Sequence, residues 1–375
     1  MTAQYEHAIN CLRGYLRDQE VEPGDRLPSE RAFAERLSLA RPALNKAIAC
    51  LIAEGLLRRE GYKLYYVGAS APAPGLPPIH IIHPRSQVYY RRGPIEAAHD
   101  VAQTFGTHTV PVLTDLPDDE REALARLLRD GTAGFVLWPL REDCDADLLA
   151  QFRRMRVPFV VCDQNVGDCD FVGVDNAAGA RLAVEHLGRI GHRNIAYLTQ
   201  SLKLPSLAQR CAGYRAACLE TRLNNAAGQV IEIPTHEEEH CREAYATLRR
   251  EYPRATAFVA SNDILALRVL ACAREDGLRL PDDLSAVGFD DIEAAAHATP
   301  ALTTVHQDFY EIGYVAAQQL FRRMGEGKAG AERAPVRLRL EPRLVERAST
   351  VPPAERRGKS RDTRQKRETG RREYR

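Results

Sequence analysis

The sequence predicts an α/β protein in which a small helical domain precedes a larger domain with two parallel sheets flanked by helices. Residues 5–67 carry three amphipathic helical patterns followed by a two-strand pattern. A segment rich in Pro, Gly and Ala comes next, at residues 68–78. Short apolar runs then alternate with helical stretches up to about residue 290. Strands spaced in this way form parallel sheets that are covered on both faces.

The N-terminal domain has clear helix and turn signals. Apolar residues recur on one helical face in three stretches, at residues 5–17, 29–37 and 41–54. Ser29 is a good N-cap for the second helix, and Gly55 is a typical stop for the third. Residues 56–67 alternate around Gly61 as a two-stranded wing would. Three helices and a wing in this order make a winged helix-turn-helix.

The larger domain begins where the Pro- and Gly-rich segment ends, since such a composition resists packing and is typical of a linker. The expected strands are residues 79–83, 109–113, 134–138, 159–162, 171–174, 195–199, 230–233, 257–260 and 286–289. These are too many for one small sheet, so we expect two lobes. The predicted organisation is residues 1–68 as the first domain, 69–78 as linker, 79–348 as the two-lobed domain and 349–375 as a tail.

The tail carries ten Lys or Arg, four acidic residues and almost no large apolar side chains, which predicts disorder. Two interpretations stay open: a solvated basic tail, or a nonspecific contact to DNA phosphates.

Composition sets broad limits on the chain. Its 375 residues fit two or three folding units, and a formal net charge of +1 means that any basic surface for nucleic acid is local. No apolar run is long enough to cross a membrane, and the start lacks a signal-peptide pattern, so we expect a cytoplasmic protein. Nine scattered cysteines without a C-x-x-C pair fit a reducing compartment and core packing.

Two family resemblances cover most of the chain. The segments GDRLPSERAFAERL and ARPALNKAI resemble the winged helix-turn-helix of GntR-family regulators. Farther on, VDNAAGARLAVEHLGRIGHRNIAYL, QRCAGYRAA, VASNDILAL, GLRLPDDLSAVGFDD and LTTVHQD resemble, in order, the periplasmic-binding-protein-like sensor of the LacI/GalR family. This combination is similar to that of arabinose-repressor-like transcriptional regulators.

The resemblance implies a function without catalysis. It implies a homodimeric transcriptional regulator, a repressor of carbohydrate uptake or catabolism genes, that binds an inverted-repeat DNA operator and answers to a small sugar-like effector between the lobes. It implies no cofactor, no metal and no membrane partner. Alternatives are an activator of the same architecture, a solute-binding protein, and a zinc hydrolase.

The expected DNA contacts lie in the winged helix. The candidates are Arg26, Arg31, Arg41, Asn45, Lys46 and Lys63. Basic side chains suit phosphates, whereas base edges specify the sequence. The third helix departs from the GntR pattern, with Ala40, Ala43 and Asn45 where Ser, Thr and Arg are usual. Because Asn pairs with adenine and Arg with guanine, we expect an altered sequence preference.

The expected effector contacts follow strands or open a helix. The family match assigns Tyr89, Tyr90, Asp163, Arg210, His236, Asn262, Asp290 and Gln307. A guanidinium can donate two parallel hydrogen bonds to neighbouring oxygens, and a carboxylate accepts hydrogen bonds from hydroxyls. Asn262 has helix capping as its alternative role, Gln307 lies in a segment expected to return to the first lobe, and one of the two tyrosines is expected to stack on a sugar face.

Residues 236–240, HEEEH, fit the H-E-x-x-H pattern of zinc enzymes. A competing interpretation is stronger. Thr235 with Glu238 fits a capping box, three acids suit the first turn of a helix, and no third zinc ligand is apparent. We therefore expect no metal at these residues.

Overall fold

The computed structural model divides the chain into two compact units, residues 1–79 with 99–109 and residues 80–98 with 110–375. It describes residues 8–9, 11–12, 14–16, 21, 25–40, 43–45, 47–48, 51, 57–60, 63–66, 77–84, 92–114, 117–139, 146–165, 167–221, 223, 229–330 and 334–353. The predicted linker therefore lies outside the described residues up to position 76, and the tail lies outside them from residue 354.

The N-terminal unit has the helices and wing that the sequence predicts. All described residues of the first and third expected helices are helical, and α2 spans Glu30–Arg36. Ser29 caps α2 by accepting a hydrogen bond from the Ala32 N–H at 3.2 Å. Strands β1 (Leu57–Glu60) and β2 (Lys63–Tyr66) pair antiparallel. A core around Phe33, Leu44 and Ile48 holds these elements together.

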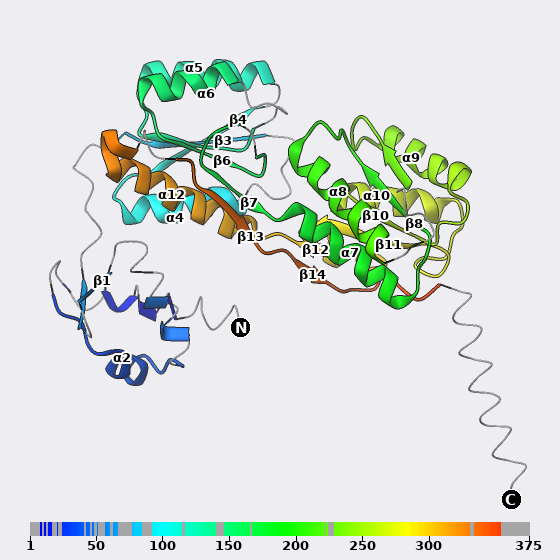
Figure 1. Cartoon of the computed structure of the whole chain (residues 1–375), viewed down its shortest axis with the longest axis horizontal. Helices are drawn as coiled ribbons and strands as arrows, with labels where there is room; N and C mark the ends of the chain where they lie inside the picture. Colours follow the sequence, from blue (N-terminus) through cyan, green and yellow to red (C-terminus); the bar gives the residue numbers. More distant parts are fainter. Residues whose placement is uncertain are drawn as a thin grey trace, which may run out of the picture. The chain divides into compact units, whose positions relative to one another are not determined.

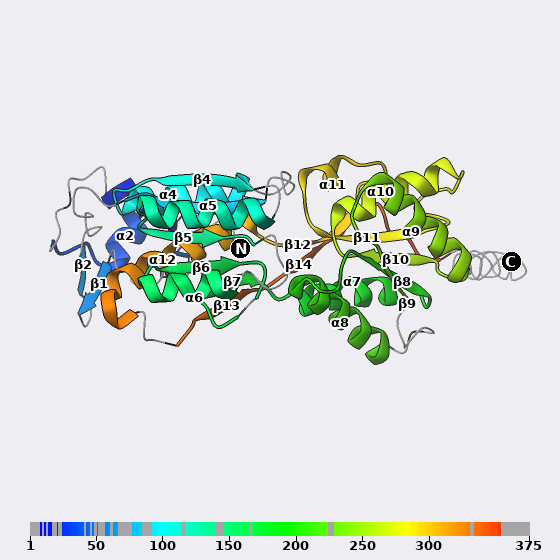
Figure 2. The same ribbon diagram turned by 90° about the horizontal axis from the view of Figure 1, so that it is seen from above.

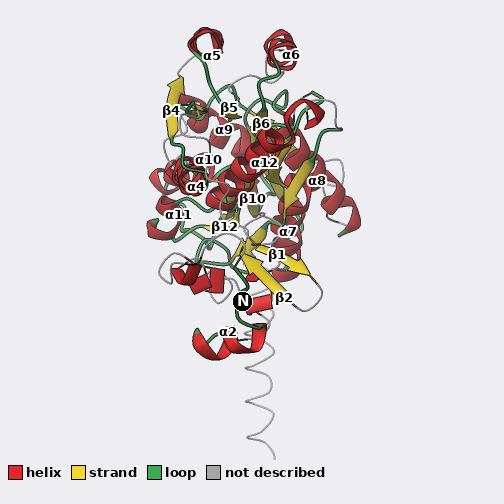
Figure 3. Cartoon of the chain, turned by 90° about the vertical axis from the view of Figure 1, so that its left-hand side faces the viewer, coloured by secondary structure: helices red, strands yellow, loops and turns green. Residues whose placement is uncertain are grey.

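The larger unit contains two six-stranded sheets. The first sheet has the order β13-β7-β6-β5-β3-β4, from Arg337–Leu340, Phe171–Val174, Phe159–Cys162, Gly134–Leu137, Ile79–Pro84 and Thr109–Thr114. Helices α5 (Pro117–Asp130) and α6 (Ala146–Met155) lie side by side on one face of it (Figures 1 and 3). Helices α4 (Arg92–Thr104) and α12 (Phe309–Gly330) lie on the other face (Figure 1). We call this assembly the first lobe.

The second sheet has the order β14-β12-β11-β10-β8-β9, from Arg343–Val345, Thr303–His306, Ser285–Asp290, Ala257–Ala260, Ile195–Thr199 and Gln229–Glu232. Its helices are α7 (Asn176–Ile190), α8 (Pro205–Glu220), α9 (Glu238–Glu251), α10 (Asp263–Glu275) and the short α11 (Glu293–His297). Figure 2 shows the two sheets from above. This assembly is the second lobe. Apart from the antiparallel β12–β14 pair, the strand pairs described in both sheets are parallel.

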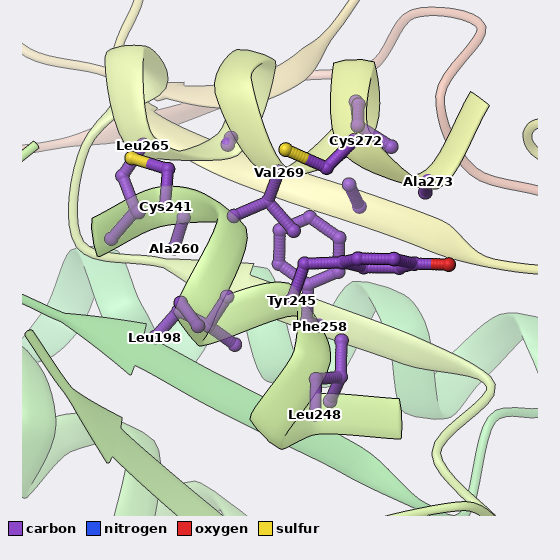
Figure 4. Packing of buried hydrophobic residues seen from close by; sticks show 14 of the residues in the cluster. Leu198, Cys241, Tyr245, Leu248, Phe258, Ala260, Leu265, Val269, Cys272 and Ala273 are labelled. Carbon is purple, nitrogen blue, oxygen red and sulfur yellow. The ribbon is translucent and has the colours of Figure 1, made fainter. Parts of the chain in front are cut away.

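Side chains that alternate along the strands of the second sheet pack into two separate hydrophobic cores, one on each face. Ile195 and Tyr197 pack toward α7 and α8, whereas Ala196 and Leu198 pack toward α9 and α10. Figure 4 shows the second of these cores, in which Tyr245 and Phe258 lie among aliphatic side chains. Because all residues of β8 and β10 are buried on one face or the other, these two strands appear in the sequence as largely apolar runs.

The chain passes between the lobes three times. Strand β7 of the first lobe ends at Val174 and α7 of the second begins at Asn176. Strand β12 ends at His306 and α12, which packs on β5, β6 and β7, begins at Phe309. Strand β13 ends at Leu340 and β14 begins at Arg343. Each connection is one or two residues long.

The predicted fold class is confirmed, with one correction at the C-terminal end. Residues 349–351, expected to start a disordered tail, belong to the second lobe. Ser349 is fully buried, its hydroxyl donates to the Ala286 carbonyl at 2.7 Å, and the Val351 N–H donates to the Ser285 hydroxyl at 3.1 Å. Among the described helices, none is long and apolar enough to cross a membrane.

A close approach of α7 and α8 gives a stability prediction. A Cβ atom added at Gly213 of α8 would lie 2.3 Å from the Ala177 carbonyl oxygen, so the backbones must separate. We expect Gly213→Ala to lower the free energy of unfolding by about 3 kcal/mol, measured by urea denaturation with circular dichroism.

The matched control is Gly188→Ala in α7, because the nearest atoms to a Cβ there are 4.0 Å away. That change is expected to add about 0.5 to 1 kcal/mol through helix propensity. Equal effects at the two positions would contradict the packing argument.

Candidate functional site

The candidate site forms where parallel strands end, the edge at which open parallel sheets bind ligands. In the second lobe, Gln200 follows β8, Ser261 and Asn262 follow β10, Asp290 ends β11 and Gln307 follows β12. In the first lobe, Trp138 follows β5 and Asp163 follows β6. The fold thus brings polar side chains from distant parts of the sequence to the carboxyl edges of both sheets.

Arg210 of α8 is the centre of this cluster and is only 4% exposed. Its Nε donates to Asn176 Oδ1 at 2.7 Å, and its Nη1 donates to the Ser261 carbonyl at 2.5 Å and to Asp290 Oδ1 at 3.3 Å. The guanidinium carbon lies 3.7 Å from the centre of the Phe289 ring. Contacts on three sides fix the plane of the guanidinium, so its remaining edge can be presented to a ligand without reorganisation.

Asp290 is the acidic partner of Arg210. Its Oδ1 also accepts a hydrogen bond from Gln307 Nε2 at 2.7 Å, and its backbone has a positive φ of 112°. Burial raises the pKa of the Asp290 carboxyl to about 7, while Arg210 acts to lower the pKa and Asp163 acts to raise it. A buried ion pair is costly to form unless further hydrogen bonds complete it, and Gln307 supplies one.

Asp163 brings a second carboxylate from the first lobe. Its Oδ2 accepts a hydrogen bond from Gln164 Nε2 at 2.8 Å. Burial raises the pKa of Asp163, and the charge of Arg210 partly offsets that effect. Arg210 acts to lower the pKa of both carboxyls, Asp163 and Asp290. Asp163 also has a positive φ, of 63°, the left-handed conformation that short polar side chains tolerate best.

Several buried polar atoms at these strand ends lack a hydrogen-bond partner within the described chain. They are Asp163 Oδ1, Ser261 Oγ, Gln307 Oε1 and Trp138 Nε1. An unsatisfied buried polar atom costs about 1 to 3 kcal/mol. Because the set includes acceptors and a donor, a ligand rich in hydroxyl groups can satisfy it.

Asn262 and His236 belong to a neighbouring polar chain. Asn262 Oδ1 caps α10 by accepting from the Leu265 N–H at 2.8 Å, so the capping alternative holds for this side chain. Its Nδ2 donates to Gln200 Oε1 at 2.8 Å, and Gln200 Nε2 lies 3.1 Å from His236 Nδ1. Burial lowers the pKa of His236, as does the nearby charge of Arg268. No hydrogen bond between described residues links His236 directly to Arg210.

The H-E-x-x-H segment does not place its imidazoles on one helix face. Helix α9 begins at Glu238, so His236 precedes it, and His240 Nδ1 pairs with Thr235 Oγ1 at 2.9 Å. The capping box predicted between Thr235 and Glu238 is wrong. The N-cap is Glu237, which makes no side-chain capping bond, and its N–H instead donates to the Thr235 hydroxyl.

The remaining predicted residues divide into described and undescribed ones. Arg26 is exposed and forms a β-bridge with Tyr65, Arg31 lies in α2, Asn45 is exposed in a helical segment and Lys63 is exposed at the start of β2. Tyr89, Tyr90, Arg41 and Lys46 lie outside the described residues.

Sequence reasoning missed Asn176, Ser261, Gln164, Ser206 and Trp138. Their positions directly after strands or near helix starts were the only available signal.

Comparisons with known proteins agree with the predicted fold class. A family model described as bacterial regulatory proteins of the gntR family matches residues 4–67, and a periplasmic binding protein-like domain matches residues 184–350. A solved LacI transcriptional regulator from a Rhodococcus species is 30% identical, with a TM-score of 0.64 over 73% of this chain and 98% of that one. The chain belongs to the LacI family of transcriptional regulators.

Two curated relatives of this LacI-family regulator are themselves repressors. The arabinose metabolism transcriptional repressor of Geobacillus stearothermophilus is 27% identical over 83% of this chain and 88% of its own length. The HTH-type transcriptional repressor PurR of Salmonella paratyphi B is 32% identical over 54% of this chain, which spans 59% of the PurR length. These relatives are transcriptional regulators rather than enzymes.

The raised pKa of Asp290 gives a pH prediction for this regulator. Its folded-state pKa of about 7 lies above the ordinary value of 3.8, so the folded protein holds this proton between those values and loses stability as the pH rises through them. Asp290→Asn removes that loss. The free energy of unfolding of the variant minus that of the wild type should rise by more than about 1 kcal/mol from pH 4 to pH 7.

Denaturant titrations at each pH measure this difference. Asp130→Asn, which changes an exposed carboxylate at the end of α5, is the matched control. Its free energy of unfolding minus that of the wild type should stay constant between pH 4 and pH 7. A flat difference for Asp290→Asn as well would contradict the assignment.

Proposed function

We propose that this chain is a repressor that binds an inverted-repeat operator as a homodimer and is controlled by a small sugar-like effector held between the two lobes. The observation that carries the proposal is the set of unsatisfied polar atoms on Ser261, Gln307 and Asp163, beside the buried Arg210–Asp290 pair at the carboxyl edges of the sheets. The two curated relatives are both named as transcriptional repressors, which supports the repressor role.

The chemistry of the site favours a neutral, hydroxyl-rich effector. Carboxylate oxygens of Asp163 and Asp290 accept from hydroxyls, and Arg210 donates to neighbouring oxygens of one ligand. The indole N–H of Trp138 adds a donor from the first lobe. Together these groups fit vicinal hydroxyls better than an apolar surface, since each buried polar atom then gains a partner.

Control requires that the effector bind two states of the protein with different affinity. The three short connections between the lobes, at residues 175, 307–308 and 341–342, allow the lobes to rotate as bodies. Gln307 links one of these connections directly to Asp290. An effector that bridges both lobes therefore favours one rotation, and by linkage operator DNA changes the effector affinity by the same factor as the effector changes DNA affinity.

A ligand screen tests the effector assignment. Thermal unfolding of the purified chain is measured with monosaccharides, sugar acids and nucleosides, and a true effector at 100 times its dissociation constant stabilises by about 2.7 kcal/mol. Arg210→Lys should weaken binding of the best hit at least about tenfold, because an ammonium cannot replace the fork geometry.

Arg215→Lys changes an exposed residue of the same helix and serves as the control. Equal affinity of the wild type and Arg210→Lys for that hit would remove Arg210 from the site. A hit that leaves operator binding unchanged at every concentration would contradict the regulatory proposal.

The DNA side has its own test. Asn45 is exposed on the third helix, where the side chain can reach a base edge, and two winged helices of a dimer reach half-sites about 34 to 36 Å apart. We expect operators selected by the wild type to carry A at the contacted position, and Asn45→Arg to shift the preference to G by about 1 to 3 kcal/mol. Fluorescence anisotropy with paired A and G operators measures the preference. An unchanged preference in both proteins would end this assignment.

A further inference from the structure

The side-chain amide of Gln164 makes hydrogen bonds within its own lobe and to the other lobe. It follows Asp163 in the first lobe and is 6% exposed. Its Nε2 donates to Asp163 Oδ2 and to the Ser206 hydroxyl, each at 2.8 Å, and its Oε1 accepts from the Ser206 backbone N–H at 3.1 Å. One amide thus holds a carboxylate of its own lobe and two groups of the other lobe.

The Ser206 N–H needs an acceptor because it lies in the first turn of α8. The first N–H groups of a helix have no partner within the helix, and an N-cap side chain usually supplies one. Here the N-cap is Leu204, which makes no side-chain hydrogen bond, and Pro205 at the next position has no N–H. The acceptor for the Ser206 N–H is therefore Gln164 Oε1, which belongs to the first lobe and lies 42 residues earlier in the chain.

We propose that Gln164 is a positioning residue that caps α8 from the opposite lobe and so holds the lobes in the arrangement seen here. Arg210 lies one helical turn beyond Ser206, and Asp163 accepts a hydrogen bond from the same amide. The link therefore acts on the relative position of these two charged side chains. The inference rests on the proposed function for its biological meaning. The contact itself is independent of effector and DNA.

Separation of the lobes would cost α8 its cap. Loss of an N-cap shifts a helix equilibrium by about tenfold. One such contact is therefore large enough to bias the lobe arrangement. A simple structural cap would act on α8 alone, whereas the proposed link acts on both α8 and the distance between the lobes.

The first experiment measures hydrogen exchange of the Ser206 amide in the full chain, without effector or DNA. In Gln164→Ala, exchange should accelerate about tenfold, the change expected for loss of a helix cap. Gln151→Ala removes an amide from α6 of the same lobe and should leave the rate unchanged. An unchanged rate in Gln164→Ala would overturn the proposal.

The second experiment separates the link from simple capping. Nitroxide labels on encoded side chains replace the exposed Met155 of α6 and Leu219 of α8, and pulsed spin resonance measures their separation. Gln164→Ala should lengthen and broaden the distance distribution. Adding Leu204→Ser supplies a local cap, so it should restore the Ser206 exchange rate while the distance stays long. Restoration of both, or an unchanged distance in Gln164→Ala, would overturn the proposal.

A variant of equal size guards against misfolding of the alanine variant. Gln164→Glu keeps an acceptor for the Ser206 N–H but places a second carboxylate beside Asp163 and loses both donated bonds. Exchange of Ser206 should stay near the wild-type rate while the distance distribution lengthens. A wild-type distance in this variant would contradict the link. Because these measurements use neither effector nor operator, their failure leaves the proposed function standing, and a failed ligand screen leaves them interpretable.

Discussion

Burial of the Arg210 guanidinium is the constraint on which the rest of the site depends. A guanidinium that is only 4% exposed requires compensation for its charge, and three different elements provide it. Asn176 comes from the start of α7, Ser261 from the end of β10, and Phe289 and Asp290 from the end of β11. Burial of the guanidinium therefore requires all of these elements in their places, and their hydrogen bonds offset its cost.

The sequence predicted strands best where both faces of the sheet are covered. The runs at residues 159–162, 171–174, 195–199 and 257–260 coincide with β6, β7, β8 and β10. Such strands read as continuous apolar segments. Strands β13 and β14 were missed because they lie at sheet edges, where RLRL and RLV alternate with charged side chains. Strand β12 was missed as a strand because its two threonines and a histidine give no apolar run.

Site residues could be predicted where their position in the sequence alone marked them, and were missed where their role depends on distant contacts. Asp163, Asp290 and Gln307 follow strands, and Arg210 opens a matched segment, so the sequence pointed to them. Gln164 and Asn176 lie near a strand end and a helix start, but their roles were missed because they depend on contacts with residues 42 and 34 positions away. The capping-box prediction failed for the opposite reason, because a local pattern was present but the helix start that it requires was not. Thr235 and Glu238 have the right spacing, yet the helix begins two residues too late for the pattern to form.

The use of the C-terminal segment has a consequence for how the protein is made. Strand β13 completes the edge of the first sheet, β14 completes the edge of the second, and Ser349 is buried beneath β11 and β12. Helix α12 covers the first sheet as well. A ribosome therefore releases the compact N-terminal elements long before either lobe can close its sheet, since domains fold in the order of synthesis at about 5 to 20 residues per second. During that interval the nascent chain carries open strand edges, which can pair with other chains.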